Sequence, residues 1–120
     1  MTNKEIVAKF YDEVFNAWDT ANLARYMRED YRQHNPTVED GREGFVRFCE
    51  KFFQLHPRME ICRMVEEDDI VMVFFKCTVD AGVNKVCDIY RLQDGLLAEH
   101  WDVVQHLDPA LVPANENGNF

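Results

Sequence analysis

The sequence predicts an α+β domain in which N-terminal helices pack on one face of an antiparallel sheet. Apolar residues recur every three or four positions in the first half of the chain. The second half carries β-branched and aromatic runs separated by turn residues. The 120 residues suffice for one hydrophobic core and not for two. Helices first and strands afterwards favour a meander of strands covered on one face by the helices.

The first helix is expected close to the N-terminus. Thr2 and Glu5 have the spacing of a capping box, in which a hydroxyl and a carboxylate satisfy the free amides of a helix start. An apolar stripe follows at helical spacing, formed by Ile6, Val7, Phe10, Val14 and Trp18. We expect this stripe, Trp18 included, to lie in the core or in a cavity wall.

Two further helical segments are expected before the sheet. Asp19 and Thr20 can cap a short helix that carries Leu23, Ala24 and Met27. The segment Tyr31–Pro36 is predicted to be extended, because proline disfavours helix at the residue before it. From about Arg42 the helical period resumes and ends at His56-Pro57, with its apolar positions at Phe45, Phe48, Cys49, Phe52 and Leu55.

Four strands are predicted after this helix. They span Met59–Glu66, Ile70–Val79, Val86–Leu92 and Leu96–Gln105. Asp68-Asp69, Ala81–Asn84 and Asp94-Gly95 are the turns between them. From Asp108 the proline, asparagine and glycine content indicates an irregular tail. We therefore expect one domain over residues 1–107 and a tail over 108–120.

The charge balance excludes several classes of partner. Thirteen basic against 22 acidic residues give a net charge of −9, which repels nucleic-acid backbones and anionic membranes. The longest apolar run, Ile70–Phe75, is far too short to cross a bilayer, and no signal segment is present. The four cysteines lack Cys-x-x-Cys spacing, and we expect them to be reduced thiols in the core. A cytoplasmic protein is expected.

The pairing of the last hairpin decides which polar side chains share a face. A two-residue loop at Asp94-Gly95 would place Asp88 opposite Trp101, whereas a three-residue loop with Gly95 as a bulge would place Asp88 opposite His100. The hydrophobic pattern favours the three-residue loop. One face then carries Asp88, Tyr90, Ala98, His100, Asp102 and Val104. The other carries Ile89, Arg91, Leu97, Glu99, Trp101, Val103 and Gln105.

Three titratable residues, Asp88, His100 and Asp102, would therefore converge among apolar neighbours. Burying unpaired charge is costly, so such groups pair with one another or become more readily neutralised. A carboxylate in that setting accepts a proton well near neutral pH, as general acid/base chemistry requires. A satisfied polar pair on an exposed sheet face would have the same spacing, and spacing alone leaves both interpretations open.

Four segments carry a family resemblance. They are Tyr31-Arg32-Gln33-His34-Asn35-Pro36, Asp40-Gly41, Asp88–Gly95, and Glu99–Gln105, which reads Glu-His-Trp-Asp-Val-Val-Gln. In this order they resemble the SnoaL-like polyketide cyclase family of the nuclear-transport-factor-2-like superfamily. The resemblance extends from the first helix to Gln105. It implies a cone-shaped α+β barrel, in which a curved, mostly antiparallel sheet and the helices enclose a deep pocket.

The resemblance also implies a function and an assembly. In the family's cyclases a pocket aspartate is the acid/base of an aldol ring closure without metal or organic cofactor, and Asp102 stands at the matching position. His34 and His100 match pocket positions that could polarise a carbonyl or bind the carboxylate. The antibiotic-pathway cyclases have a histidine at the position of Asp88, and this difference weakens the case for a polyketide substrate. A homodimer is implied, and the outer sheet face around Trp101 would suit that contact.

The leading hypothesis is a cofactor-independent enzyme acting on a small apolar carbonyl compound by aldol cyclisation or condensation, isomerisation or dehydration. Its candidate catalytic residues are Asp102, His34, His100 and Asp88, and Tyr31 and Tyr90 are candidate donors to the substrate. A non-catalytic binding module is the main alternative. A metal site of His34, His100 and Asp102, or an epoxide hydrolase using Asp88 and Asp102, ranks lower; the latter would need Arg91 to face inward.

Overall fold

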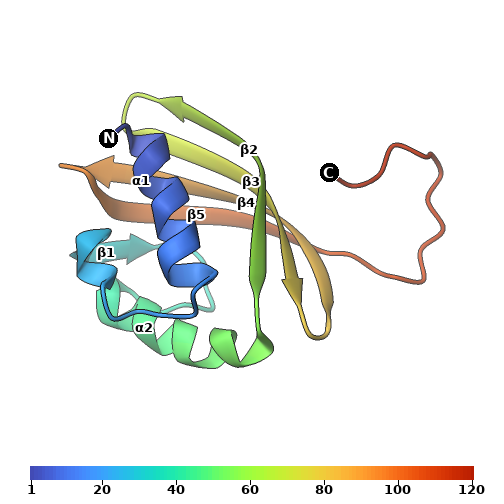
Figure 1. The fold of residues 1–120 in the computed structure, drawn as a ribbon, viewed down its shortest axis with the longest axis horizontal. Helices are drawn as coiled ribbons and strands as arrows, with labels where there is room; N and C mark the ends of the chain where they lie inside the picture. The colour runs from blue at the N-terminus through green and yellow to red at the C-terminus, as the bar shows by residue number, and fades with distance from the viewer.

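The protein folds as two helices packed against one face of a curved five-stranded sheet. The computed structural model describes all residues from Met1 to Phe120. The strand order is β1-β5-β4-β3-β2, antiparallel except that β1 runs parallel to β5. Figure 1 shows α1 lying across the sheet and α2 running beneath it. The sheet does not close, because its two edge strands, β1 and β2, do not pair. The predicted α+β class is confirmed.

The first helix starts as the sequence predicts and ends earlier. Helix α1 spans Asn3–Phe10, with both hydrogen bonds of the capping box present at Thr2 and Glu5. It continues as a wider π-helical turn over Tyr11–Phe15. The expectation for Trp18 was wrong: this residue has φ 53° and leaves the helix, and it is 46% exposed. Its indole instead donates to the carbonyl of Pro57 at 2.7 Å.

The segment after α1 differs most from the prediction. A single 3-10 turn, Leu23–Arg25, replaces the short helix, and Met27 begins strand β1, Met27–Gln33. Met27 is fully buried beside Leu97, its partner on β5. The helix predicted from Arg42 is confirmed as α2, Gly41–Phe52, followed by a 3-10 turn, Phe53–Leu55.

The four predicted strands are confirmed, but β4 starts four residues earlier than predicted, because the turn before it is Asp80-Ala81 and not Ala81–Asn84. They are β2, Arg58–Glu67; β3, Ile70–Val79; β4, Gly82–Gln93; and β5, Leu96–His106. Alternate residues of β3 are buried against the helices: Val71, Val73, Phe75 and Cys77. The core therefore lies between this inner face of the sheet and the apolar sides of α1 and α2.

The β4–β5 hairpin corrects the predicted register. Its loop is the two-residue turn Asp94-Gly95, both at positive φ, and Gln93 pairs with Leu96. A bulge then adds one residue at Ala98, so that Arg91 pairs with Glu99 and Asp88 with Asp102. The bulge restores the predicted face for Asp88, Tyr90, His100 and Asp102, although Asp88 lies opposite Asp102 and not opposite His100. It also turns Leu97 into the core, contrary to expectation.

The chain after β5 has neither helix nor strand. Figure 1 shows this tail extending away from the sheet before it turns back. Its last residue, Phe120, packs on the outward-facing Phe74, with ring centroids 6.0 Å apart. Among the helices, none is long and apolar enough to span a membrane.

Candidate functional site

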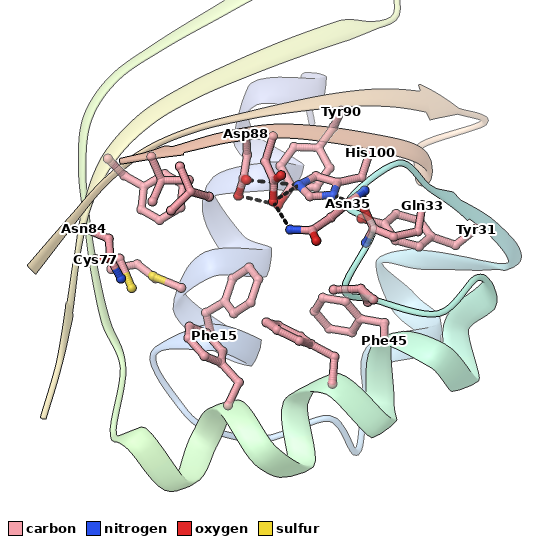
Figure 2. A pocket seen from close by; sticks show the side chains of 18 of the residues that line it. Phe15, Tyr31, Gln33, Asn35, Phe45, Cys77, Asn84, Asp88, Tyr90 and His100 are labelled. Carbon is pink, nitrogen blue, oxygen red and sulfur yellow. Dashed lines mark hydrogen bonds and ion pairs between the residues drawn. The ribbon is translucent and has the colours of Figure 1, made fainter. Parts of the chain in front are cut away.

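A pocket of about 230 Å³ lies between the inner face of the sheet and the two helices. Figure 2 shows aromatic side chains from the π-helical turn after α1 and from α2, among them Phe15 and Phe45, opposite polar side chains of β4 and β5. Most of the lining residues are hydrophobic. Several of the polar lining residues, Asp88, His100 and Asp102 among them, gather in one part of the pocket.

Asp88 and His100 form a buried pair. They are 5% and 7% exposed and are the two buried polar residues of the chain. His100 Nε2 lies 3.0 Å from Asp88 Oδ1 and 3.9 Å from Asp102 Oδ2. The convergence expected from the sequence is therefore present, and His100 is the hydrogen-bond partner of Asp88.

Two tyrosines hold the second oxygen of Asp88. The hydroxyls of Tyr11 and Tyr90 both donate to Asp88 Oδ2, Tyr90 at 3.0 Å. Burial, followed by the charge of Asp88, raises the pKa of both phenols well above the ordinary value, so they remain protonated donors. Tyr11 begins the π-helical turn of the first helix, a distortion found often at functional sites.

Gln33 determines that Nδ1 of His100 carries a hydrogen. Its Oε1 accepts hydrogen bonds from the backbone N–H groups of His34 at 3.1 Å and Asn35 at 3.0 Å, which fixes the orientation of the amide. The same oxygen lies 2.6 Å from His100 Nδ1, so Nδ1 must carry a hydrogen. One more proton then lies between His100 Nε2 and Asp88 Oδ1. His100 thus bridges the Gln33 amide and Asp88 Oδ1, while the two phenols donate to the other carboxyl oxygen of Asp88.

Asp102 differs from Asp88 in having a free oxygen. Asn35 Nδ2 donates to Asp102 Oδ2 at 2.9 Å, whereas Oδ1 has no hydrogen-bond partner in the protein. Asp102 is only partly buried and lines the pocket. Its free lone pairs can therefore accept a proton or a hydrogen bond from a molecule in the pocket.

His34 does not join this group, which corrects the sequence-based expectation. Tyr31, Gln33 and Asn35 face the pocket, so the alternation of an extended chain turns His34 to the other side. There His34 Nε2 lies 2.6 Å from Glu99 Oε2, and its ring stacks on Trp101 at 4.8 Å. The same alternation brings Gln33 and Asn35 to the site, and the sequence contained that signal.

Tyr31 lies in the pocket wall, as expected for a donor to substrate. Its ring is nearly parallel to that of His100 at 6.3 Å, and its hydroxyl has no hydrogen-bond partner in the protein. Burial, followed by the charges of Asp88 and Asp102, raises the pKa of this phenol well above the ordinary value. The Tyr31 hydroxyl is therefore a protonated donor available to a ligand, whereas the Tyr90 hydroxyl is already bonded to Asp88.

The site also bears on the two lower-ranked hypotheses. Ligand atoms of Asp88, His100 and Asp102 lie within 4.8 Å of one another, a donor set that suits a divalent cation once the proton between Asp88 and His100 leaves. The set with two histidines does not form, because His34 lies on the outer face. Arg91 lies there too, 3.1 Å from Glu99, and does not bridge Asp88 and Asp102.

The curved sheet and the helices that cover one of its faces have the nuclear-transport-factor-2-like α+β fold. The chain belongs to the SnoaL-like domain family, whose model matches residues 7–100. A search of curated protein sequences found no match.

Solved structures with the same fold share little sequence with the chain. TsrD from Streptomyces laurentii is 21% identical, with a TM-score of 0.72 over 87% of this chain and 91% of that one. IdmH, a proposed polyketide cyclase from Streptomyces antibioticus, is 18% identical, with a TM-score of 0.74 over 87% and 92%. A proposed ketosteroid isomerase from Kribbella flavida is 18% identical, with a TM-score of 0.77 over 98% and 90%.

Proposed function

We propose that this protein is a cofactor-independent acid/base enzyme that removes a proton next to the carbonyl group of a small apolar compound, with Asp102 as the base. One observation carries the proposal: Asp102 Oδ1 is unpartnered in a largely apolar pocket, whereas the neighbouring Asp88 and His100 are held by hydrogen bonds within the protein. Several structures of this fold bear the names of polyketide cyclases or a ketosteroid isomerase, which is in keeping with carbonyl chemistry.

The proposed step conserves charge within the pocket. Asp102 Oδ1 takes the α-proton, the C–H electron pair becomes the C=C bond of an enolate, and the negative charge moves to the former carbonyl oxygen. The Tyr31 hydroxyl donates to that oxygen, in the manner of an oxyanion hole. His100 Nε2 lies 3.9 Å from Asp102 Oδ2, on the oxygen that does not take the proton.

The fate of the enolate decides the net reaction. Return of the proton from Asp102 to another carbon gives an isomerisation, and attack of the enolate carbon on a second carbonyl gives an aldol closure. Loss of water after that attack gives a dehydration. All three begin with the same proton transfer, so one assay tests them together.

The substrate is small. A cavity of about 150 Å³ holds benzene, so the 230 Å³ pocket takes a compound of one or two rings. A four-ring intermediate exceeds it.

The test is exchange of the α-hydrogens of 2-tetralone in heavy water, followed by proton NMR and corrected for the buffer rate. The wild type should accelerate exchange, and Asp102→Asn should lower the rate by about 10²- to 10⁴-fold, since it removes a general base. Asp12→Asn, the same change at an exposed carboxylate, is the matched control. Equal rates for wild type and Asp102→Asn would refute the proposal.

A non-catalytic binding module is the second candidate. The complete hydrogen bonding of Asp88 and His100 favours it, because such a satisfied network can serve simply to shape a pocket. Under this alternative 2-tetralone would bind without any gain in exchange rate over buffer.

A further inference from the structure

The inner face of the β4–β5 hairpin has polar pairs at two levels of the pocket. Asp88 lies opposite Asp102, Val86 opposite Val104, and Asn84 opposite His106. All six residues line the pocket. A polar level is therefore followed by an apolar level and then by a second polar level, which lies near the start of β4 and at the end of β5.

The second polar level has open hydrogen-bonding groups. His106 Nδ1 lies 2.6 Å from Asn84 Oδ1, so Nδ1 donates to the amide oxygen and Nε2 is left for a ligand. Neither His106 Nε2 nor Asn84 Nδ2 has a partner in the protein. A hydroxyl group suits this pair, because it can donate to Nε2 and accept from the amide at once.

The spacing of the two levels constrains a ligand that reaches both. Residues four apart on a strand are separated by roughly 13 Å, so Asp102 and His106 mark distant parts of one pocket. Since the pocket holds only about 230 Å³, it suits a slender molecule whose apolar middle lies against the paired Val86 and Val104.

We infer that Asn84 and His106 form a subsite for a hydroxyl group at the end of the ligand remote from its reacting carbonyl. The carbonyl end of this assignment rests on the proposed function, whereas the hydroxyl end rests on the contacts of Asn84 and His106 alone. The substrate class is thus a one- or two-ring ketone with a distal hydroxyl group. The net charge of −9 and the two aspartates of the pocket favour this neutral group over a carboxylate.

The test compares the binding of 2-tetralone and its 6-hydroxy derivative by isothermal titration calorimetry. The hydroxylated ketone should bind the wild type about 3- to 10-fold more tightly, as one or two neutral hydrogen bonds allow. This preference should fall below about 2-fold in Asn84→Ala and in His106→Ala, with the affinity for 2-tetralone unchanged. Gln105→Ala, next to His106 and outside the pocket lining, is the matched control and should keep the preference.

The subsite and the proposed function fail separately. Equal affinities of the two ketones for the wild type would overturn the subsite even if α-hydrogen exchange is accelerated. A preference lost in Asn84→Ala without any exchange would refute the enzyme and leave the subsite standing. Failure of both ketones to bind would overturn the ligand class.

Discussion

Replacing Tyr11 by phenylalanine should destabilise the protein more than loss of an ordinary surface hydrogen bond would. The phenol of Tyr11 is one of two that donate to Asp88 Oδ2, and Asp88 is almost completely buried. Phenylalanine preserves the packing of the ring, so the change isolates the hydroxyl. Removing a hydrogen bond to a charged group costs about 1.5–3 kcal/mol. Water cannot replace the lost donor at this depth.

The same substitution at Tyr26 provides the control. The Tyr26 hydroxyl also donates to a carboxylate, that of Glu13, but the Glu13 side chain is half exposed and water can replace the phenol. Tyr26→Phe should therefore cost less than about 1 kcal/mol.

Urea unfolding followed by circular dichroism measures both variants. With a slope of about 1–3 kcal/mol per molar urea, Tyr11→Phe should lower the midpoint by about 1 M. A Tyr11→Phe midpoint equal to that of the wild type, or to that of Tyr26→Phe, would refute the assignment of Asp88 as a buried carboxylate.

Three further predictions concern the outer face and the thiols. The hydrogen bond from His34 lowers the pKa of Glu99 below its ordinary 4.5, so this bond stabilises the fold above that pH and ceases to do so as pH falls through the folded-state pKa. The urea midpoint should therefore drop less between pH 6 and pH 3.5 in His34→Ala than in wild type. Equal drops would contradict this. Burial raises the pKa of Cys77 to about 11, so iodoacetamide at pH 8 should label the exposed Cys62 and spare Cys77 in peptide mass spectra; equal labelling would show that Cys77 is accessible. Val103 on the outer sheet face is 68% exposed. If that face joins two copies of the chain, the wild type should sediment as a dimer and Val103→Lys as a monomer. A wild type that sediments as a monomer would exclude the dimer.

Local sequence signals predicted the elements that depend on near neighbours. The capping box of Thr2 and Glu5 and the alternation along Ile70–Val79 both involve residues a few positions apart, and both are present as predicted. Tyr31–Gln33 was predicted to be extended, but the first part of strand β1 was missed because its sequence, Met-Arg-Glu-Asp, is highly charged. It becomes a strand through parallel pairing with β5, a partner about 70 residues away.

The part of the candidate site that depends on local alternation along a strand was predictable from the sequence. Asp88, His100 and Asp102 share a face as expected, although the bulge at Ala98 that sets their pairing leaves no clear mark in the sequence. His34 was assigned to the pocket through the family resemblance, whereas strict alternation from Tyr31 would have selected Gln33 and Asn35. Tyr11 lies on the apolar side of the first helix, but its contact with Asp88 spans 77 positions and depends on the tertiary fold.

The central claim is that Asp102 is the base and needs no metal ion, and α-hydrogen exchange of 2-tetralone in heavy water tests it most directly. The rate should be compared for untreated wild type, wild type treated with a chelator, and Asp102→Asn. We predict equal acceleration by the first two and a loss of about 10²-fold or more in Asp102→Asn. A rate abolished by the chelator would assign Asp88, His100 and Asp102 to a metal instead. A rate retained in Asp102→Asn would contradict the proposed base.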